Sequence, residues 1–216
     1  MTAPLLPSTI AAPVDRELVV KRSRFLAHLA PVADVAEADA VVAAIRKEHW
    51  DARHHCVALV VGTHADQQRS TDDGEPSGTA GVPMLEVLRH RGVTDVVAVV
   101  TRYFGGVLLG AGGLVRAYSS AVSEALDDAR LVRRAVRTRV TVDVPHADAG
   151  RLHGVLQDWA TTHDGVLDGV AYEAQARFTL LVAPDDLDRF DADLAAATSG
   201  ALAAVRGDDR VVDLDR

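Results

Sequence analysis

The sequence predicts an α+β protein built from two domains. Its 216 residues are enough for one large domain or two small ones. The alternation of strand and helix patterns starts again after a basic segment near residue 137, and the charge changes at the same place. Residues 1–135 hold 15 Lys and Arg against 16 Asp and Glu, a net charge of −1, whereas residues 136–216 hold 8 against 15, a net charge of −7. The two parts therefore differ electrostatically, as separate domains do.

We place the boundary where the pattern restarts. The first predicted domain covers residues 18–134 and the second covers residues 137–216. The segment between them is predicted to be a short basic linker that contains Arg133, Arg134 and Arg137.

The first domain shows strand and helix patterns in turn. Phe25, Ala27 and Leu29 alternate with polar residues as in a half-buried strand, and Asp34 is placed to cap the helix that follows it. The expected elements are a strand over 23–30, a helix over 35–49, a buried strand over 56–61, a polar loop over 63–81 with no element of its own, a helix over 83–91, a central strand over 96–101 and a long helix from Gly112. Long loops in compact domains are usually functional, so residues 63–81 are the first place to look for function.

The second domain repeats a simpler pattern. Val140, Val142 and Val144 alternate as a strand does, and a helix over 152–159 follows. Two strands over 166–172 and 178–182, a helix over 187–197 and a last strand over 205–214 complete the order βαββαβ. This order predicts a ferredoxin-like domain.

The composition excludes several classes of protein. Apolar residues make up 48% and charged residues 25%, which excludes a disordered or collagen-like chain. The net charge of −8 excludes a general polyanion binder, so any nucleic-acid contact must be a local patch. Cys56 is the sole cysteine, which excludes an internal disulfide. The first seven residues lack the basic start of a targeting signal, and no apolar run approaches the ~18 residues of a membrane span. We expect a cytoplasmic protein with no membrane partner.

An acidic loop is the first candidate site. Asp72, Asp73 and Glu75 flank Gly74, and three carboxylates beside a glycine turn could hold a hard cation. The spacing of an EF-hand is absent, however, and no lysine follows the glycines as it would in a phosphate-binding P-loop. The alternative is a structural loop whose Asp side chains stabilise turns. We assign no metal ligand.

A glycine-rich turn is the second candidate. It lies between a strand and a helix, so backbone N–H groups and the helix dipole would converge on an anion there. Arg102 and Arg116 could add phosphate contacts, and Tyr103, Phe104 and Tyr118 could offer stacking faces. The candidate binding residues of this turn are Arg102, Tyr103, Gly105, Gly106, Gly110, Gly112, Gly113 and Arg116. The alternative is that the glycines permit close packing and the arginines pair with the acidic loop. Under either interpretation we expect the acidic loop to close over this turn, with Asp72 and Asp73 near Arg102 and Arg116.

The run His54-His55-Cys56 is a weaker candidate. On a strand His54 and Cys56 share one face and His55 points the other way, so at most two of them can serve one metal or one nucleophile. We interpret Cys56 as a small buried apolar residue.

The two longest motifs are similar to those of a known family. The first is RSTDDGEPSGTAG at 69–81, and the second is VTRYFGG at 100–106 followed by LGAGGLVRAY at 109–118. In this order they closely resemble the IMPACT family, in particular its bacterial YigZ-type members. The resemblance spans about residues 23–129.

The resemblance implies a fold and a field of action. It implies that the first domain has the fold of domain 2 of ribosomal protein S5, and that the two domains together resemble domains IV and V of translation elongation factor G. Eukaryotic relatives are similar in the first domain and act in translational control by binding a ribosome-associated activator of a stress kinase. The family has no established catalytic residues, so we assign none here and expect no cofactor.

The leading hypothesis is a non-catalytic regulator of translation or stress response that binds RNA, the ribosome or a translation-associated protein through the face formed by the two motifs. The alternative is a phosphate- or nucleotide-binding enzyme, in which the glycine-rich turn holds phosphate and the acidic loop holds Mg²⁺. A plain protein-interaction module needs neither feature. The oligomeric state does not follow from the sequence.

Overall fold

The computed structural model describes residues 6–214. The start of the N-terminal segment, residues 1–5, lies outside the described residues, as do the last two residues of the second predicted domain. The described chain divides into two compact units, one of residues 6–134 with 213–214 and one of residues 135–212. The division falls beside the segment where the pattern restarts. The first unit begins well before residue 18, because one strand lies at Thr9–Ile10 and the next begins at Val14.

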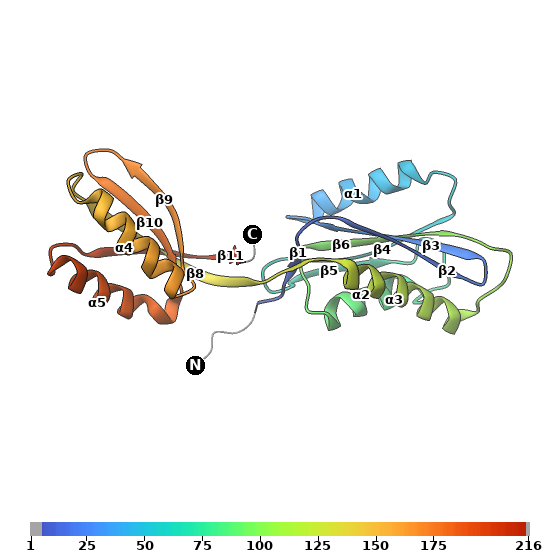
Figure 1. Cartoon of the computed structure of the whole chain (residues 1–216). Coiled ribbons are helices and arrows are strands. Elements are labelled where there is room, and N and C mark those ends of the chain that lie inside the picture. Colours follow the sequence, from blue (N-terminus) through green and yellow to red (C-terminus); the bar gives the residue numbers. More distant parts are fainter. Residues whose placement is uncertain (1–5, 215–216) are drawn as a thin grey trace. The chain divides into compact units, whose positions relative to one another are not determined.

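One antiparallel sheet organises the first domain. Within residues 6–134, five strands pair in the order β2-β3-β6-β4-β5 (Figure 1). They are β2 (Val14–Val20), β3 (Ser23–Pro31), β6 (Val96–Tyr103), β4 (His54–Val61) and β5 (Gln67–Thr71). Helix α1 (Val35–Glu48) packs on one face, and α2 (Gly81–His90) and α3 (Ala111–Asp128) pack on the other. The short strands β1 (Thr9–Ile10) and β7 (Leu131–Val132) pair separately.

The alternation along the strands explains the two layers of core. Phe25, Ala27 and Leu29 of β3 point towards α2 and α3, while the central strand β6 is apolar on both faces because helices cover both of them. Asp34 caps α1 as predicted, since its carboxylate accepts the N–H of Glu37 at 2.8 Å. The predicted central position of β6 is also confirmed.

Two predictions about local structure are wrong. Residues 63–81 are not free of elements, because they contain the edge strand β5 and the first residue of α2. β5 reads QQRST, and a polar edge strand has no apolar face that a pattern could detect. Arg134 and Arg137 are not in a linker but in strand β8 (Arg134–Val144). Arg137 is buried, and its guanidinium pairs with Asp164 at 2.8 Å.

The second domain has the predicted βαββαβ order. Its described residues form the sheet β11-β8-β10-β9, with β9 (Val166–Tyr172), β10 (Ala176–Val182) and β11 (Ala204–Asp213). Helices α4 (Ala149–Thr162) and α5 (Leu187–Thr198) pack on this sheet, and a short 3-10 turn, η1 (Pro184–Asp186), precedes α5. The strand order is that of a ferredoxin-like domain, so the α+β class in two domains is confirmed. No helix among residues 6–214 is long and apolar enough to cross a membrane.

Candidate functional site

The two sequence motifs meet inside the first domain. Glu75 lies in the loop before α2, and its Oε1 accepts hydrogen bonds from Arg102 Nη1 on β6 at 2.6 Å and from the Tyr118 hydroxyl on α3 at 2.8 Å. The Arg102 guanidinium lies 5.4 Å from the ring centre of Phe25 and 5.6 Å from that of Phe104. This cluster joins a loop, a strand and a helix around one buried ion pair.

Arg102 and Glu75, two predicted binding residues, are paired with each other inside the domain, and Tyr118, a predicted stacking residue, is fully buried beside them. Only 6% of Arg102 and 9% of Glu75 is exposed. A charge that leaves water needs a partner, and each of these two charges has the other. The closing of the acidic loop over the glycine turn is thus achieved by Glu75, and not by Asp72 or Asp73.

Asp72 and Asp73 also hold the loop in place. The carboxylate of Asp72 accepts the backbone N–H groups of Gly78, Ala80 and Gly81 at 2.7 to 3.0 Å, and so caps the start of α2. Partial burial opposes ionisation of Asp72, but these three N–H groups hold the pKa of its carboxyl below the usual value. Asp73 pairs with Arg46 at 2.6 Å and accepts the N–H of His55 at 2.7 Å. Within residues 6–214, no group of three or more His, Cys, Asp or Glu side chains is placed to hold a metal ion.

Two of the glycines are required by close approach of the backbone. A Cβ at Gly105 would lie 2.0 Å from the carbonyl carbon of Arg22, and a Cβ at Gly81 would lie 2.7 Å from the backbone nitrogen of Thr71. Gly105 thereby seats the β2–β3 turn against the loop that follows β6. The remaining predicted glycines lie at positive φ or in the first turn of α3: Gly74, Gly106, Gly110, Gly112 and Gly113.

The loop between β6 and α3 is largely exposed. Leu108 is 83% exposed and Phe104 is 53% exposed, and Val107 is exposed as well. Tyr103 is half-buried, and its hydroxyl donates to Asp51 at 2.8 Å. Helix α3 starts after Gly110 with no side-chain cap. The glycine turn therefore has the open helix start that the sequence predicts. Arg102, at the end of the preceding strand, points into the core instead.

Three connecting segments meet at the same end of the sheet as this loop. Arg24 pairs with Tyr103 across β3 and β6, and His54 pairs with Arg102 across β4 and β6. The starts of β3 and β4 therefore lie beside the end of β6. We call this region the loop end; it comprises the β2–β3 turn at 21–22, the segment 47–53 at the end of α1, the loop 104–110 and the first turns of α3 (Figure 1).

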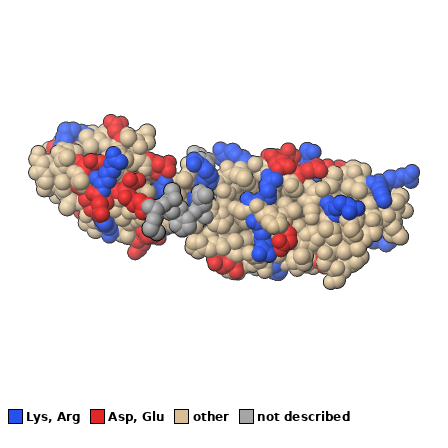
Figure 2. All heavy atoms as spheres, turned by 90° about the horizontal axis from the view of Figure 1, so that it is seen from below, with Lys and Arg blue, Asp and Glu red and all other residues tan. Residues whose placement is uncertain are grey.

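The loop end carries exposed cations that form no ion pair with any residue in the described part of the chain: Lys21, Arg22, Lys47, Arg53 and Arg116. Figure 2 shows basic side chains with almost no acidic ones between them at the right-hand end of the first domain. Most other arginines of this domain are paired, as Arg16 is with Glu124 and Asp128. Residues 47–53 also hold two exposed carboxylates, Glu48 and Asp51, so the five unpaired cations leave the loop end with a net positive charge on a nearly neutral domain.

The β2–β3 turn presents two of these cations in an unusual conformation. Lys21 and Arg22 have φ of 45° and 69°, the left-handed values that a two-residue hairpin turn requires and that favour Asn and Gly. Arg116 lines the same hollow of about 210 Å³ as Lys21, together with Leu18, Val20 and Leu109. Sequence reasoning found Arg116 but missed Lys21 and Arg22; the signal available was a Lys-Arg pair between two strand patterns.

The His54-His55-Cys56 run has a structural role. Cys56 is fully buried, its Sγ donates to the carbonyl of Asp72 at 3.1 Å, and burial raises the pKa of its thiol to about 12. A thiol with that pKa is protonated at neutral pH and does not act as a nucleophile or metal ligand. His54 Nδ1 contacts the carbonyl of Asp73 at 2.9 Å, so the run holds the acidic loop on β4.

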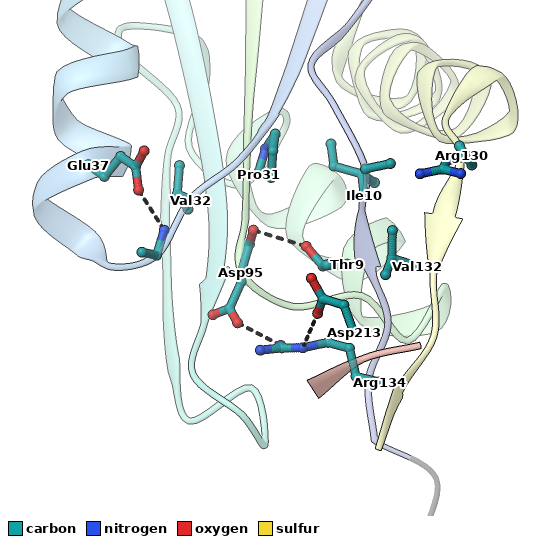
Figure 3. Close-up of a pocket in the computed structure, with 12 residues that line it drawn as sticks. Thr9, Ile10, Pro31, Val32, Glu37, Asp95, Arg130, Val132, Arg134 and Asp213 are labelled. Carbon is teal, nitrogen blue, oxygen red and sulfur yellow. Dashed lines mark hydrogen bonds and ion pairs between the residues drawn. The ribbon is translucent and has the colours of Figure 1, made fainter. Parts of the chain in front are cut away.

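A hollow of about 380 Å³ lies at the opposite end of the first domain (Figure 3). Three of its charged side chains and one hydroxyl are engaged with one another. Arg134 contacts Asp95 at 2.6 Å and Asp213 at 3.6 Å, and Thr9 Oγ1 donates to the Asp95 carbonyl at 3.4 Å. Arg130 also lines this hollow and is exposed without an ion pair among the described residues, but one such cation against five makes the hollow a weaker candidate for binding than the loop end.

Comparison with known proteins identifies both domains. Residues 21–126 match the Impact N-terminal domain, and residues 142–201 match a domain of unknown function, DUF1949. The chain is 38% identical over 192 residues to the IMPACT family member YvyE of Bacillus subtilis, covering 89% of this chain and 87% of that protein. It is 40% identical over 194 residues to the IMPACT family member YigZ of Escherichia coli, covering 89% and 93%. A crystal structure of a hypothetical protein, 37% identical, matches with a TM-score of 0.61 over 95% of this chain and 99% of that one. With both domains matched in order and at this identity, the chain belongs to the IMPACT family.

Proposed function

We propose that this protein is a non-catalytic regulator of translation or stress response that binds RNA, including the RNA of the ribosome, through the loop end. The observation that carries the proposal is the group of five exposed cations without ion pairs within residues 6–214: Lys21, Arg22, Lys47, Arg53 and Arg116. A paired arginine must give up its carboxylate to bind a phosphate, whereas an unpaired one gives up only water and counterions. These cations are therefore available to a phosphate backbone at little cost.

The charge distribution directs an RNA to the first domain. The sequence up to residue 135 has a net charge of −1 and the remainder a net charge of −7. A phosphate backbone is repelled by the second domain and attracted by the loop end, so the contact is local. Family membership supports a regulatory role, as the resemblance to translational regulators implies.

The alternative of a phosphate- or nucleotide-binding enzyme has less support. It requires Asp72, Asp73 or Glu75 to hold Mg²⁺, but their carboxylates cap α2, bind Arg46 and bind Arg102. A metal ion would have to displace partners that hold the fold together. We therefore favour binding over catalysis.

The test compares basic residues at the two ends of the first domain. In Lys21→Gln/Arg22→Gln/Arg116→Gln three unpaired cations are removed, and in Arg89→Gln/Arg91→Gln two cations at the far end of α2 that pair with Glu86 and Asp127 are removed. The first variant should weaken binding to a ribosomal RNA fragment and lower the slope of log K against log salt by about 2, because each lost phosphate contact contributes ~0.7 to 0.9. Fluorescence anisotropy at four salt concentrations measures both. Equal behaviour of the two variants and the unmodified protein would contradict the proposal.

A further inference from the structure

We infer that the loop end binds unpaired RNA, with Trp50 and Phe104 as platforms on which bases stack. This inference rests on the proposed function and specifies the class of RNA. The cations explain affinity for any phosphate backbone, whereas the two aromatic side chains explain a preference for bases that are not paired.

Both aromatic residues are largely exposed, as Tyr172 of the second domain also is. The chain has only nine Phe, Trp and Tyr residues, so each large ring is valuable to the core. Phe25 and Tyr118 pack edge to face at 5.1 Å within the core, but Trp50 is 80% exposed and Phe104 is 53% exposed. Burial of a large aromatic ring stabilises a fold substantially, and neither of these exposed rings serves that purpose.

The turn that carries Trp50 is anchored to the sheet by its two neighbours. Trp50 lies between His49 and Asp51, and both of these neighbours contact the Tyr103 hydroxyl, at 3.3 Å and 2.8 Å respectively. The ring of His49 also packs edge to face on the ring of Tyr103 at 6.2 Å. The turn that carries Trp50 is therefore fastened to the end of β6 while the indole stays in water. A backbone turn that is ordered before binding loses little entropy when a base stacks on the ring that it carries.

Phe104 is supported from behind by the buried ion pair. The guanidinium of Arg102 lies 5.6 Å from its ring centre, and Glu75 holds that guanidinium at 2.6 Å. One side of the ring thus faces a fixed cation, and more than half of the residue remains accessible. The Arg102–Glu75 pair, which has no direct role in binding, thereby orients a stacking surface.

The two platforms lie on opposite sides of the sheet end, and each has cations beside it. Tyr103 faces the α1 side, where Trp50 is anchored, and Arg102 faces the α2 and α3 side, where Phe104 covers it. Lys47 and Arg53 lie three residues before and after Trp50, while the β2–β3 turn packs on Gly105 next to Phe104. A single strand that crosses the end of the sheet therefore has both rings, and the cations beside them, within one surface. In an A-form duplex the base faces are stacked inside and cannot use either ring.

The experiment compares one RNA sequence in two forms. A labelled 12-nucleotide single strand and the same strand annealed to its complement are titrated with the full chain by fluorescence anisotropy, with single-stranded DNA of that sequence as a third probe. The variants are Trp50→Leu and Phe104→Leu. The matched control is Tyr172→Leu, which removes a ring that is 67% exposed on the acidic second domain. Melting temperatures establish that each variant is folded.

We expect each loop-end variant to bind the single strand about 5- to 150-fold more weakly, the range that corresponds to the loss of one stacked base. Duplex binding and the salt slope should stay unchanged, because no cation is removed. The Tyr172→Leu control should bind like the unmodified protein. Single-stranded DNA should follow the RNA if stacking dominates.

Failure of this inference is distinguishable from failure of the proposed function. If the triple Gln variant loses RNA binding while the aromatic variants bind both forms normally, the proposed function stands and the inference is wrong. Equal losses on single strand and duplex also overturn it. If the unmodified protein binds neither form, and ribosomal proteins are captured after RNase treatment in a manner that depends on Trp50 and Phe104, the surface binds protein and both proposals fall.

Discussion

Arg102 belongs to the most recognisable motif of the chain, yet its charge is paired with Glu75 inside the domain. Glu75 and Tyr118 bring motif residues from a loop and a helix to this one side chain. From the sequence alone, an arginine inside such a motif resembles a binding residue. The structure shows that it organises the core and supports the ring of Phe104.

At the same scale, Arg102→Ala should be strongly destabilising. Removal of one partner leaves Glu75 buried without a counter-charge, which typically costs about 3 to 5 kcal/mol. The Arg102 Nε has no hydrogen-bond partner among residues 6–214, so the pair is imperfectly solvated by the protein. The double change Arg102→Met/Glu75→Gln should therefore recover part of the loss. Urea unfolding measures both, and Arg89→Ala at an exposed pair is the control, expected to cost under about 1 kcal/mol. A loss as small for Arg102→Ala would contradict this account.

At the scale of elements, the turn of the β2–β3 hairpin carries two charged residues where Gly or Asn would be more stable. Lys21 and Arg22 occupy left-handed backbone positions, where residues other than Gly and Asn are disfavoured by roughly 1 to 2 kcal/mol each. A turn selected for stability alone would carry Asn-Gly. The presence of two cations there is consistent with a role in binding.

Lys21→Asn/Arg22→Gly should therefore have effects of opposite sign. The melting temperature should rise, corresponding to about 1 kcal/mol of stabilisation, because the new residues adopt the turn without strain. RNA affinity should fall, and the salt slope should drop by about 1.5 for two lost contacts. Differential scanning fluorimetry and anisotropy on the same preparations check both. A fall in stability would mean that the two side chains make stabilising contacts that the turn geometry does not reveal.

At the scale of the whole molecule, each domain has its own core. The two core clusters of the first domain contain no residue beyond 134, and the core of the second contains none before 135, within the described chain. Neither domain thus needs the other to bury its apolar side chains.

We accordingly predict that residues 6–134 fold as a separate fragment and retain RNA binding. The fragment lacks the contact of Arg134 with Asp213, a partly buried pair whose loss should lower its stability only moderately. The complementary fragment should fold and bind no RNA, because its net charge is strongly negative. Circular dichroism melts test whether each fragment folds, and fluorescence anisotropy tests whether it binds RNA. Two unfolded fragments would show that the domains depend on each other.

Local sequence patterns predicted much of the fold, but they failed where no apolar periodicity was present. The alternation in β3, the Asp34 cap of α1 and the βαββαβ order were all readable because each depends on neighbours in sequence. The edge strand β5 could not be predicted from its own residues, because its side chains are polar and it is held in the sheet by pairing with β4. Arg137 was wrongly assigned to a linker, because the sequence alone does not distinguish a buried arginine that is paired with an aspartate from a solvated one.

The sequence by itself determined the family, the α+β class in two domains and the division of charge between them, because motif order, periodicity and composition are properties of the chain. Tertiary structure alone decided which charges are available. It paired Glu75 with Arg102, used Asp72 to cap α2, and gathered Lys21, Arg53 and Trp50 at one end with Arg116. These residues are far apart in the chain, and whether a charge is neutralised by a neighbour or left to solvent depends on distances that only the folded chain defines.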